Sequence, residues 1–110
     1  MANNRIVVAN EPRAYREVLA AALQELRPHL EVISIEPDDL AGKVCDYRPR
    51  LVLCSQLIEA VETCSDSWIL LYPERENRAL ISVAGRQTVV TNIEFSQLLS
   101  VIDELERPAQ

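Results

Sequence analysis

Glycine is scarce in this 110-residue chain, which contains only Gly42 and Gly85. A phosphate-binding turn brings backbone amides close to its ligand, and it uses clustered glycines because side chains would block that approach. Neither glycine belongs to a glycine-rich turn between a strand and a helix. The chain therefore lacks the usual means of holding a flavin or a nucleotide, and we expect no cofactor.

Cysteine is also sparse. Cys45, Cys54 and Cys64 are odd in number, and no two of them form a Cys-x-x-Cys pair. Disulfide frameworks use even numbers of cysteines, and structural zinc sites use closely spaced pairs. We therefore expect neither a disulfide nor a metal site, and we predict that all three cysteines are reduced and at least partly shielded.

Long apolar runs and excess positive charge are missing as well. No run approaches the roughly 20 apolar residues that cross a bilayer, and the amino terminus lacks an apolar signal region. The formal net charge is −6, whereas nucleic-acid-binding proteins usually carry a basic surface. We expect a soluble, cytoplasmic protein that binds neither membranes nor nucleic acids.

The totals that remain are those of one globular domain. Hydrophobic residues make up 48% of the chain and charged residues 25%, which are ordinary values for a folded domain. A chain of 110 residues can bury one core but not two. We predict a single domain over residues 1–110, with its core at about 5–106 and a frayed tail at 107–110.

The clearest pattern is Pro49-Arg50-Leu51-Val52-Leu53-Cys54-Ser55. Four apolar residues that follow a proline and precede a polar residue predict a central strand, buried on both faces as in a parallel sheet. Ligands of open α/β sheets gather where strands finish at their carboxyl ends. Cys54 and Ser55 therefore stand where a functional site is expected.

Strands and helices alternate along most of the chain. We predict strands at 5–9, 30–35, 51–54 and 68–72, and helices at about 10–27, 36–47 and 55–64. This order predicts a flavodoxin-like α/β fold, with a mostly parallel sheet and helices on both faces. The strand at 30–35 is less continuously apolar and is placed nearer the edge, and Arg16 is assigned to the polar face of the first helix.

Beyond Pro73 the pattern changes. Two strand-like runs at 79–84 and 87–90 flank Gly85-Arg86, which predicts an antiparallel hairpin after the strand at 68–72. The strand at 87–90 is then an edge strand. A last helix follows and runs to about 106.

Polar residues precede three of the predicted helices. Asn10 suits the cap of the first helix, Ser55 the cap of the third, and Thr91 a capping box with Glu94 at the start of the last. Capping alone explains these residues, although a functional role at the sheet edge stays open for them.

This order of elements resembles a response-regulator receiver domain, most clearly from Arg5 to Ser55 and from Thr88 to Glu106. The shared features are the first strand with its acidic turn, the "PRLVLCS" strand and the amphipathic last helix. Receivers carry an acidic pair for magnesium, an aspartate that accepts phosphate, a Ser/Thr and a lysine. The resemblance implies that these positions fall on Asn10, Glu11, Ser55, Tyr72 and Thr91.

Too few of the receiver's functional groups are present for its chemistry. One carboxylate remains at the magnesium position, a serine replaces the aspartate, and the lysine is missing. The resemblance is thus to a degenerate, or pseudo-receiver, domain with a hairpin at about 79–90 in place of a helix. It implies a non-enzymatic signalling module that acts through protein–protein interaction without aspartyl phosphorylation.

Two further hypotheses concern specific residues. Cys54 or Ser55 could instead carry chemistry, as a thiol-based redox sensor or a serine phosphoryl carrier at the end of the central strand. The edge strand at 87–90 carries Val89 and Val90 and precedes Phe95. Because an unguarded sheet edge can pair with another chain, we predict a symmetric homodimer formed through residues 79–99.

Overall fold

The computed structural model describes residues 4–71, 77–83 and 85–106. Its elements are β1 (Arg5–Ala9), α1 (Arg13–Leu26), β2 (Glu31–Ser34), α2 (Pro37–Tyr47), β3 (Leu51–Cys54), α3 (Glu59–Cys64), β4 (Ser67–Leu71), β5 (Arg78–Val83), β6 (Arg86–Thr91) and α4 (Phe95–Glu106). Within the described ranges, the strands form a six-stranded sheet in the order β2-β1-β3-β4-β5-β6. The predicted α/β class is confirmed.

The first four strands form the parallel half of the sheet. β1 pairs with β2 on one side and with β3 on the other, and β3 pairs with β4, all in parallel. Every residue of β3 is fully buried, as its unbroken apolar sequence predicts. β2 lies at the sheet edge, as its mixed apolar and polar composition predicts.

The last two strands form an antiparallel extension. β4 ends at Leu71 and β5 begins at Arg78, which leaves too little chain for a crossover helix. β5 pairs antiparallel with β4, and β6 pairs antiparallel with β5. Gly85 adopts a positive φ of 84° in the turn between β5 and β6, a conformation that glycine tolerates because it has no side chain. The predicted hairpin and edge strand are confirmed.

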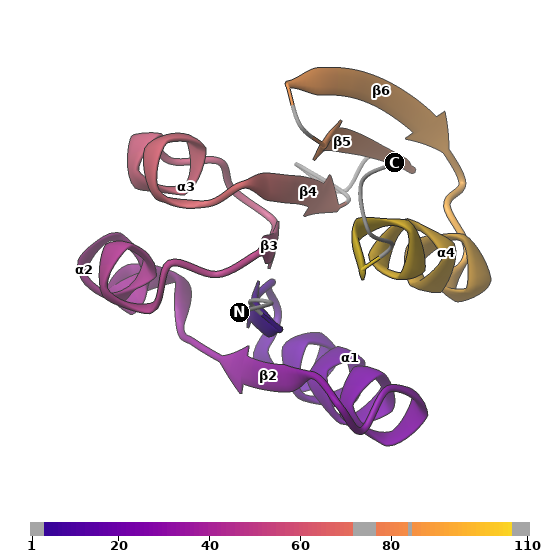
Figure 1. Cartoon of the computed structure of the whole chain (residues 1–110), viewed down its shortest axis with the longest axis horizontal. Coiled ribbons are helices and arrows are strands. Elements are labelled where there is room, and N and C mark those ends of the chain that lie inside the picture. The colour runs from indigo at the N-terminus through magenta and orange to yellow at the C-terminus, as the bar shows by residue number, and fades with distance from the viewer. Residues whose placement is uncertain (1–3, 72–76, 84, 107–110) are drawn as a thin grey trace.

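Helices cover both faces of the parallel half (Figure 1). α1 and α4 lie on one face, where Leu19, Leu23, Leu98 and Ile102 pack with Val8 and the other strand residues that point the same way. α2 and α3 lie on the opposite face, over Val7, Val52 and Trp68. Successive side chains along each strand therefore pack into two separate cores, one on each face of the sheet.

Three helices begin later than predicted, and the largest difference is at α3. α2 starts as predicted, with Glu36 before it, Pro37 in its first position and Asp38 and Asp39 in its first turn. α3 occupies only Glu59–Cys64, so the prediction that it starts at Ser55 is wrong. No helix among the described residues has the length and apolarity to span a bilayer.

Candidate functional site

The carboxyl ends of β1 and β3 bring together residues that are 45 positions apart in the chain. The two strands pair in parallel with Ala9 opposite Cys54, so Asn10 and Ser55 follow at neighbouring positions of the same sheet edge. The backbone N–H of Glu11 donates a hydrogen bond to the Ser55 hydroxyl over 3.1 Å. Asn10, Glu11 and Ser55 therefore meet at the expected edge of the sheet.

The other two receiver-like positions do not join them. Thr91 ends β6, which is separated from β3 by β4 and β5. Tyr72 lies outside the described residues. Thr91 is also not part of a helix cap, because it belongs to a strand and α4 begins only at Phe95. The predicted capping box is therefore wrong, although the Glu94 N–H is capped by the Gln97 side chain at 2.7 Å.

Asn10 does not cap α1. Pro12 is the residue before the helix, and it makes no side-chain capping bond. Asn10 is instead fully buried, and among the described residues neither polar atom of its side chain has a hydrogen-bond partner. Its backbone carbonyl accepts a hydrogen bond from Nη1 of Arg16 at 3.3 Å. A short polar residue before a helix resembles a cap in sequence, but here tertiary packing encloses it.

Ser55 does not cap a helix either, because α3 begins four residues later and follows Ile58. Ser55 is partly exposed, and its hydroxyl accepts a hydrogen bond from the Glu11 N–H. Within the described ranges, no carboxylate or imidazole is hydrogen-bonded to this hydroxyl. A serine needs such a base to become a strong nucleophile, so its surroundings do not activate it.

Cys54 lies directly before this edge and is fully buried. Its thiol faces the Ile69 carbonyl at 3.9 Å. Burial raises the pKa of the Cys54 thiol to about 12, although a backbone hydrogen bond from Gln56 lowers it in part. Because the thiolate is the reactive form, a buried and protonated Cys54 is poorly suited to redox or nucleophilic chemistry.

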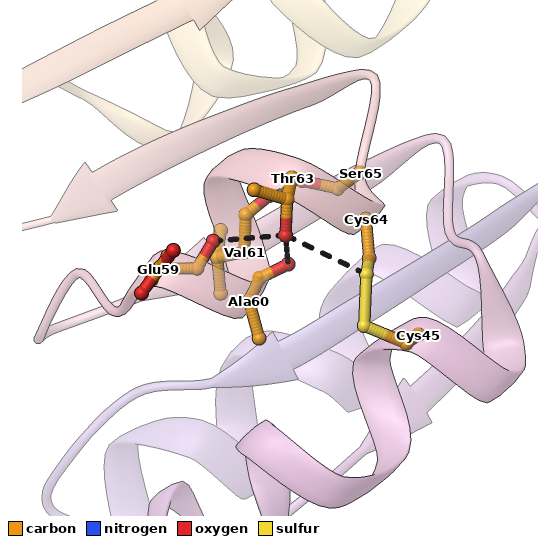
Figure 2. Close-up of a disulfide and its surroundings, with 7 residues drawn as sticks. All are labelled: Cys45, Glu59, Ala60, Val61, Thr63, Cys64 and Ser65. Atoms are coloured by element: carbon orange, nitrogen blue, oxygen red, sulfur yellow. Dashed lines mark hydrogen bonds between the residues drawn. A yellow bond between two sulfur atoms is a disulfide. The ribbon is translucent and has the colours of Figure 1, made fainter.

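The other two cysteines are not free thiols. Cys45 in α2 and Cys64 in α3 form a disulfide, with their Cα atoms 4.9 Å apart (Figure 2). Thr63 lies beside the bond, its hydroxyl oxygen 3.7 Å from the Cys64 sulfur. The prediction that Cys45 and Cys64 are reduced is therefore wrong, and so is the expectation of a chain without disulfides.

A signal for this disulfide was present in the predicted topology. The strand order places α2 and α3 side by side on one face of the sheet, and both cysteines lie near the carboxyl ends of these helices. The number of cysteines and the search for a Cys-x-x-Cys pair describe only their spacing in sequence. Spatial proximity follows instead from right-handed crossovers that run in the same direction.

Sequence reasoning also misplaced Arg16. This residue was assigned to the polar face of α1, yet it is buried on the face that carries Leu19 and Leu23. The spacing of 16, 19 and 23 is the i, i+3, i+7 pattern of a single helical face. The signal was thus present in the sequence, but the assignment followed the charge of Arg16 and not its position on the helix.

The three predicted interface residues have different surroundings. Val89 is exposed on the edge strand β6, whereas Val90 and Phe95 are partly buried against the core shared with α1 and α4. Phe95 also lines an apolar pocket of about 360 Å³ between these helices, together with Tyr15 and Val18. The edge of β6 and this pocket are therefore separate surface features.

No cluster of metal-ligating side chains occurs in the part of the chain that the structure describes. Comparison with protein-family models, curated proteins and solved structures found no match to this chain.

Proposed function

We propose that this protein is a non-catalytic, receiver-like regulatory module that acts by pairing with protein along the free edge of its sheet, in the first place with a second copy of itself. The observation that supports this proposal is the exposure of β6. It is the last strand of the sheet, and all its residues except Val90 are exposed.

The chemistry of β6 suits strand addition. An edge strand has backbone N–H and C=O groups directed away from its neighbour, and proline, lysine or a covering helix normally protects them. β6 contains neither proline nor lysine, and Val89 is 57% exposed. Antiparallel pairing about a twofold axis through Val89 would place this side chain opposite its own copy and join two sheets.

The proposal includes the absence of aspartyl phosphorylation. Ser55 stands at the position of the receiver's acceptor, and Asn10 and Glu11 offer one carboxylate where magnesium needs more. We expect no stable gain of a phosphoryl group after treatment with acetyl phosphate and magnesium, as measured by intact-protein mass. A phosphorylated species that survives purification would contradict this part of the proposal.

Chemistry at Cys54 or Ser55 was the alternative function. The burial and raised pKa of Cys54, together with the unactivated hydroxyl of Ser55, favour the binding module over this alternative. Rapid alkylation of Cys54 in the folded protein at neutral pH would reverse the preference.

Cytoplasmic localisation is also part of the proposal, and the disulfide makes it testable. Cys45 is exposed and Cys64 partly so, and cytosolic reductants keep most such pairs as thiols. If the protein is cytoplasmic, acid lysis of cells with an alkylating agent should trap Cys45 and Cys64 as thiols, and the disulfide of the structure would then form only on oxidation. A fully oxidised pair under these conditions would place the protein in an oxidising compartment.

The direct test of edge pairing is sedimentation at micromolar concentration. We expect a dimer for the parent and a monomer for Val89→Lys, because two ammonium groups would face each other across the twofold axis. Val18→Lys is the matched control, since Val18 is 67% exposed on α1, away from β6.

Each result of these sedimentation experiments leads to a different conclusion about the interface. A monomeric parent contradicts self-pairing, and a folded Val89→Lys variant that remains dimeric excludes β6 as the interface. If Val18→Lys dissociates the dimer while Val89→Lys does not, the interface lies on α1 beside the apolar pocket.

A further inference from the structure

The Cys45–Cys64 disulfide lies at the surface of the protein, beside a polar hollow. Cys45 is exposed and Cys64 is partly exposed. The hollow has a volume of about 440 Å³, and its lining includes both cysteines together with Arg48, Thr63 and Asp66. Exposed disulfides are the ones that thiols reach most readily, and labile or regulatory disulfides belong to this group. The bond between α2 and α3 is therefore accessible to a small thiol while the protein stays folded.

The helix that this disulfide holds has few other attachments. α3 occupies only Glu59–Cys64, and Val61 is its only buried residue. An isolated helix needs roughly 12–15 residues to be even marginally stable in water. The Glu62 N–H reaches the Ile58 carbonyl only at 3.4 Å, which is long for a backbone hydrogen bond. The covalent link to α2 is therefore a major part of what keeps α3 in place.

The third cysteine lies in the core that α3 covers. Cys54 is fully buried at the end of β3, in the same apolar cluster as Val61, with Leu57 and Ile58 packed against that cluster. The chain from residue 55 to residue 66 connects β3 to β4 and contains α3. Opening of this connection would uncover the Cys54 thiol.

We propose that Cys45 and Cys64 form a redox switch, which fastens α3 to α2 when oxidised and lets residues 55–64 open locally when reduced. In the oxidised protein the crosslink divides the connection between β3 and β4 into shorter loops, so it removes many conformations of an opened segment. Reduction restores these conformations, and local opening becomes easier. Thiol chemistry in this protein is thereby assigned to the surface pair and not to Cys54.

The reaction that operates the switch is thiol–disulfide exchange with a small thiol such as glutathione. The thiolate of one glutathione attacks Sγ of Cys45, the more exposed residue, and the sulfur of Cys64 leaves as a thiolate that takes up a proton. A second glutathione then attacks the glutathione sulfur of this mixed disulfide. Cys45 becomes a thiol, glutathione disulfide is released, and two electrons have passed to the protein. The reverse exchange with glutathione disulfide reforms the bond.

Thr63 is a positioning residue for this exchange. Its hydroxyl oxygen lies 3.7 Å from Sγ of Cys64 and 3.1 Å from the carbonyl oxygen of Glu59 (Figure 2). A hydroxyl that turns toward Cys64 can donate to the departing thiolate and lower its pKa, and thiols of lower pKa leave faster. Thr63→Val should therefore slow reduction by glutathione by about two- to tenfold. Thr63→Ser, which keeps the hydroxyl, should restore the parental rate.

The switch is separate from the proposed pairing at β6. Its two helices lie next to each other over the parallel half of the sheet (Figure 1), whereas β6 is the outermost strand of the antiparallel extension. A failure of edge pairing would leave the switch untouched, and the reverse also holds.

Alkylation of Cys54 measures the opening of α3. The oxidised parent and the double variant Cys45→Ser with Cys64→Ser each have Cys54 as their one free thiol. With iodoacetamide at neutral pH, followed by intact-protein mass, we expect the variant to react at least about tenfold faster than the oxidised parent. The rate should change little with urea below the unfolding transition, because local opening exposes little surface. Equal rates in the two proteins would overturn the proposal.

Leu98→Ala separates local opening from unfolding of the whole domain. Leu98 is buried in the core on the opposite face of the sheet, so its truncation lowers global stability and leaves the disulfide intact. At urea concentrations that give both proteins the same free energy of unfolding, the double-serine variant should still alkylate several-fold faster. Equal rates there would mean that Cys54 is uncovered only by global unfolding, which excludes the switch. The reduced parent, read by peptide mapping of Cys54, gives the same comparison without any substitution.

Single variants test where the thiol attacks. Cys64→Ser leaves Cys45 without its partner, and Cys45→Ser does the same for Cys64. With glutathione disulfide, Cys45 should form the mixed disulfide several-fold faster than Cys64, because it is more exposed; faster reaction at Cys64 would overturn this order of attack. The folded parent should lose its disulfide in reduced glutathione and regain it in glutathione disulfide, both without denaturant. A bond that is reduced only after the protein unfolds would overturn the switch itself.

Discussion

The parallel half of the sheet and its antiparallel extension differ mainly in how they are covered. All of β3 is buried, between the core of α1 and α4 on one face and the core of α2 and α3 on the other. β6 is exposed along nearly its whole length. The two strands belong to one sheet and are separated by only two others.

The difference follows from the connections. A parallel strand is reached through a crossover, and the crossover helix then covers one face of the sheet. An antiparallel hairpin adds a strand without adding a helix. The two strand sequences show the same difference: β3 is Leu-Val-Leu-Cys, which is entirely apolar, whereas β6 is Arg-Gln-Thr-Val-Val-Thr, which is mostly polar. Stability should therefore concentrate in the parallel half, and accessible edges in the extension.

A pair of matched truncations tests this difference most strongly. Leu53→Ala in β3 should lower the free energy of unfolding by about 2–5 kcal/mol, because it leaves a cavity beneath α1 and α4. Val89→Ala in β6 should change it by less than about 0.5 kcal/mol, since Val89 is already exposed. Urea unfolding of both variants, below the concentration at which the parent dimerises, measures the two values. Similar losses would show that the extension is as tightly packed as the parallel half.

The disulfide adds a covalent link on the parallel side. Cys45 and Cys64 are 19 residues apart, and closing a loop of this length should stabilise the fold by about 3 kcal/mol. The double variant Cys45→Ser with Cys64→Ser should lose that amount in urea unfolding.

Reduction of the parent provides the control for this prediction. Dithiothreitol should lower the stability of the parent to that of the double-serine variant, and it should leave the variant itself unchanged. A parent that is equally stable with and without reductant would mean that the link between α2 and α3 constrains little.

The same contrast explains which features could be predicted from sequence. The strands of both halves were identified, because an apolar run and a hairpin around Gly85 are local signals. The meeting of polar residues at one edge of the sheet was also predicted, as Asn10, Glu11 and Ser55 do lie together there. These predictions needed only the order of the elements and the general geometry of parallel sheets.

What was missed depends on contacts between elements that are distant in sequence. Capping signals for Asn10 and Ser55 are local, but neither residue caps a helix, because packing between β1, β3 and α1 determines their partners. The Cys45–Cys64 bond requires two helices to share a face. The burial of Arg16 contradicts its charge, and such conflicts between local pattern and structure are typical of functional sites.

The buried thiol of β3 makes the stability of the parallel half depend on pH. The pKa of Cys54 is about 12 in the fold and 9.0 as its ordinary value. Above pH 9 the unfolded chain loses this proton while the folded chain keeps it, so stability falls as pH rises. Between pH 8 and 10, ionisation of this one group in the unfolded chain should lower the free energy of unfolding by about 1 kcal/mol.

Comparison with Cys54→Ala isolates this effect. Urea unfolding of both proteins at pH 8 and pH 10 should show the larger loss in the parent, and the difference between the two losses is the contribution of the thiol. Identical losses would mean that Cys54 is already able to ionise in the folded protein, which would restore the case for a reactive thiol at this position.

The smallest expected effect concerns an ion pair that joins the two regions. Arg27 follows α1, in the parallel half, and Asp103 lies in α4, after the antiparallel extension. Nε and Nη2 of Arg27 contact the two carboxylate oxygens of Asp103 at 2.8 and 2.7 Å, with the side chains 27% and 44% exposed.

A double-mutant cycle with Arg27→Gln and Asp103→Asn should give a coupling of about 1 kcal/mol, since the paired geometry favours the bond and partial exposure limits it. The Arg13–Glu17 pair within α1 is the control, and its single 2.9 Å contact is more exposed, so its coupling should be clearly smaller. Both couplings should shrink in 1 M salt, the exposed pair more completely. If the two cycles give equal values, the Arg27–Asp103 contact is an ordinary surface pair, and the attachment of α4 to the parallel half depends on the apolar contacts of Leu98 and Ile102.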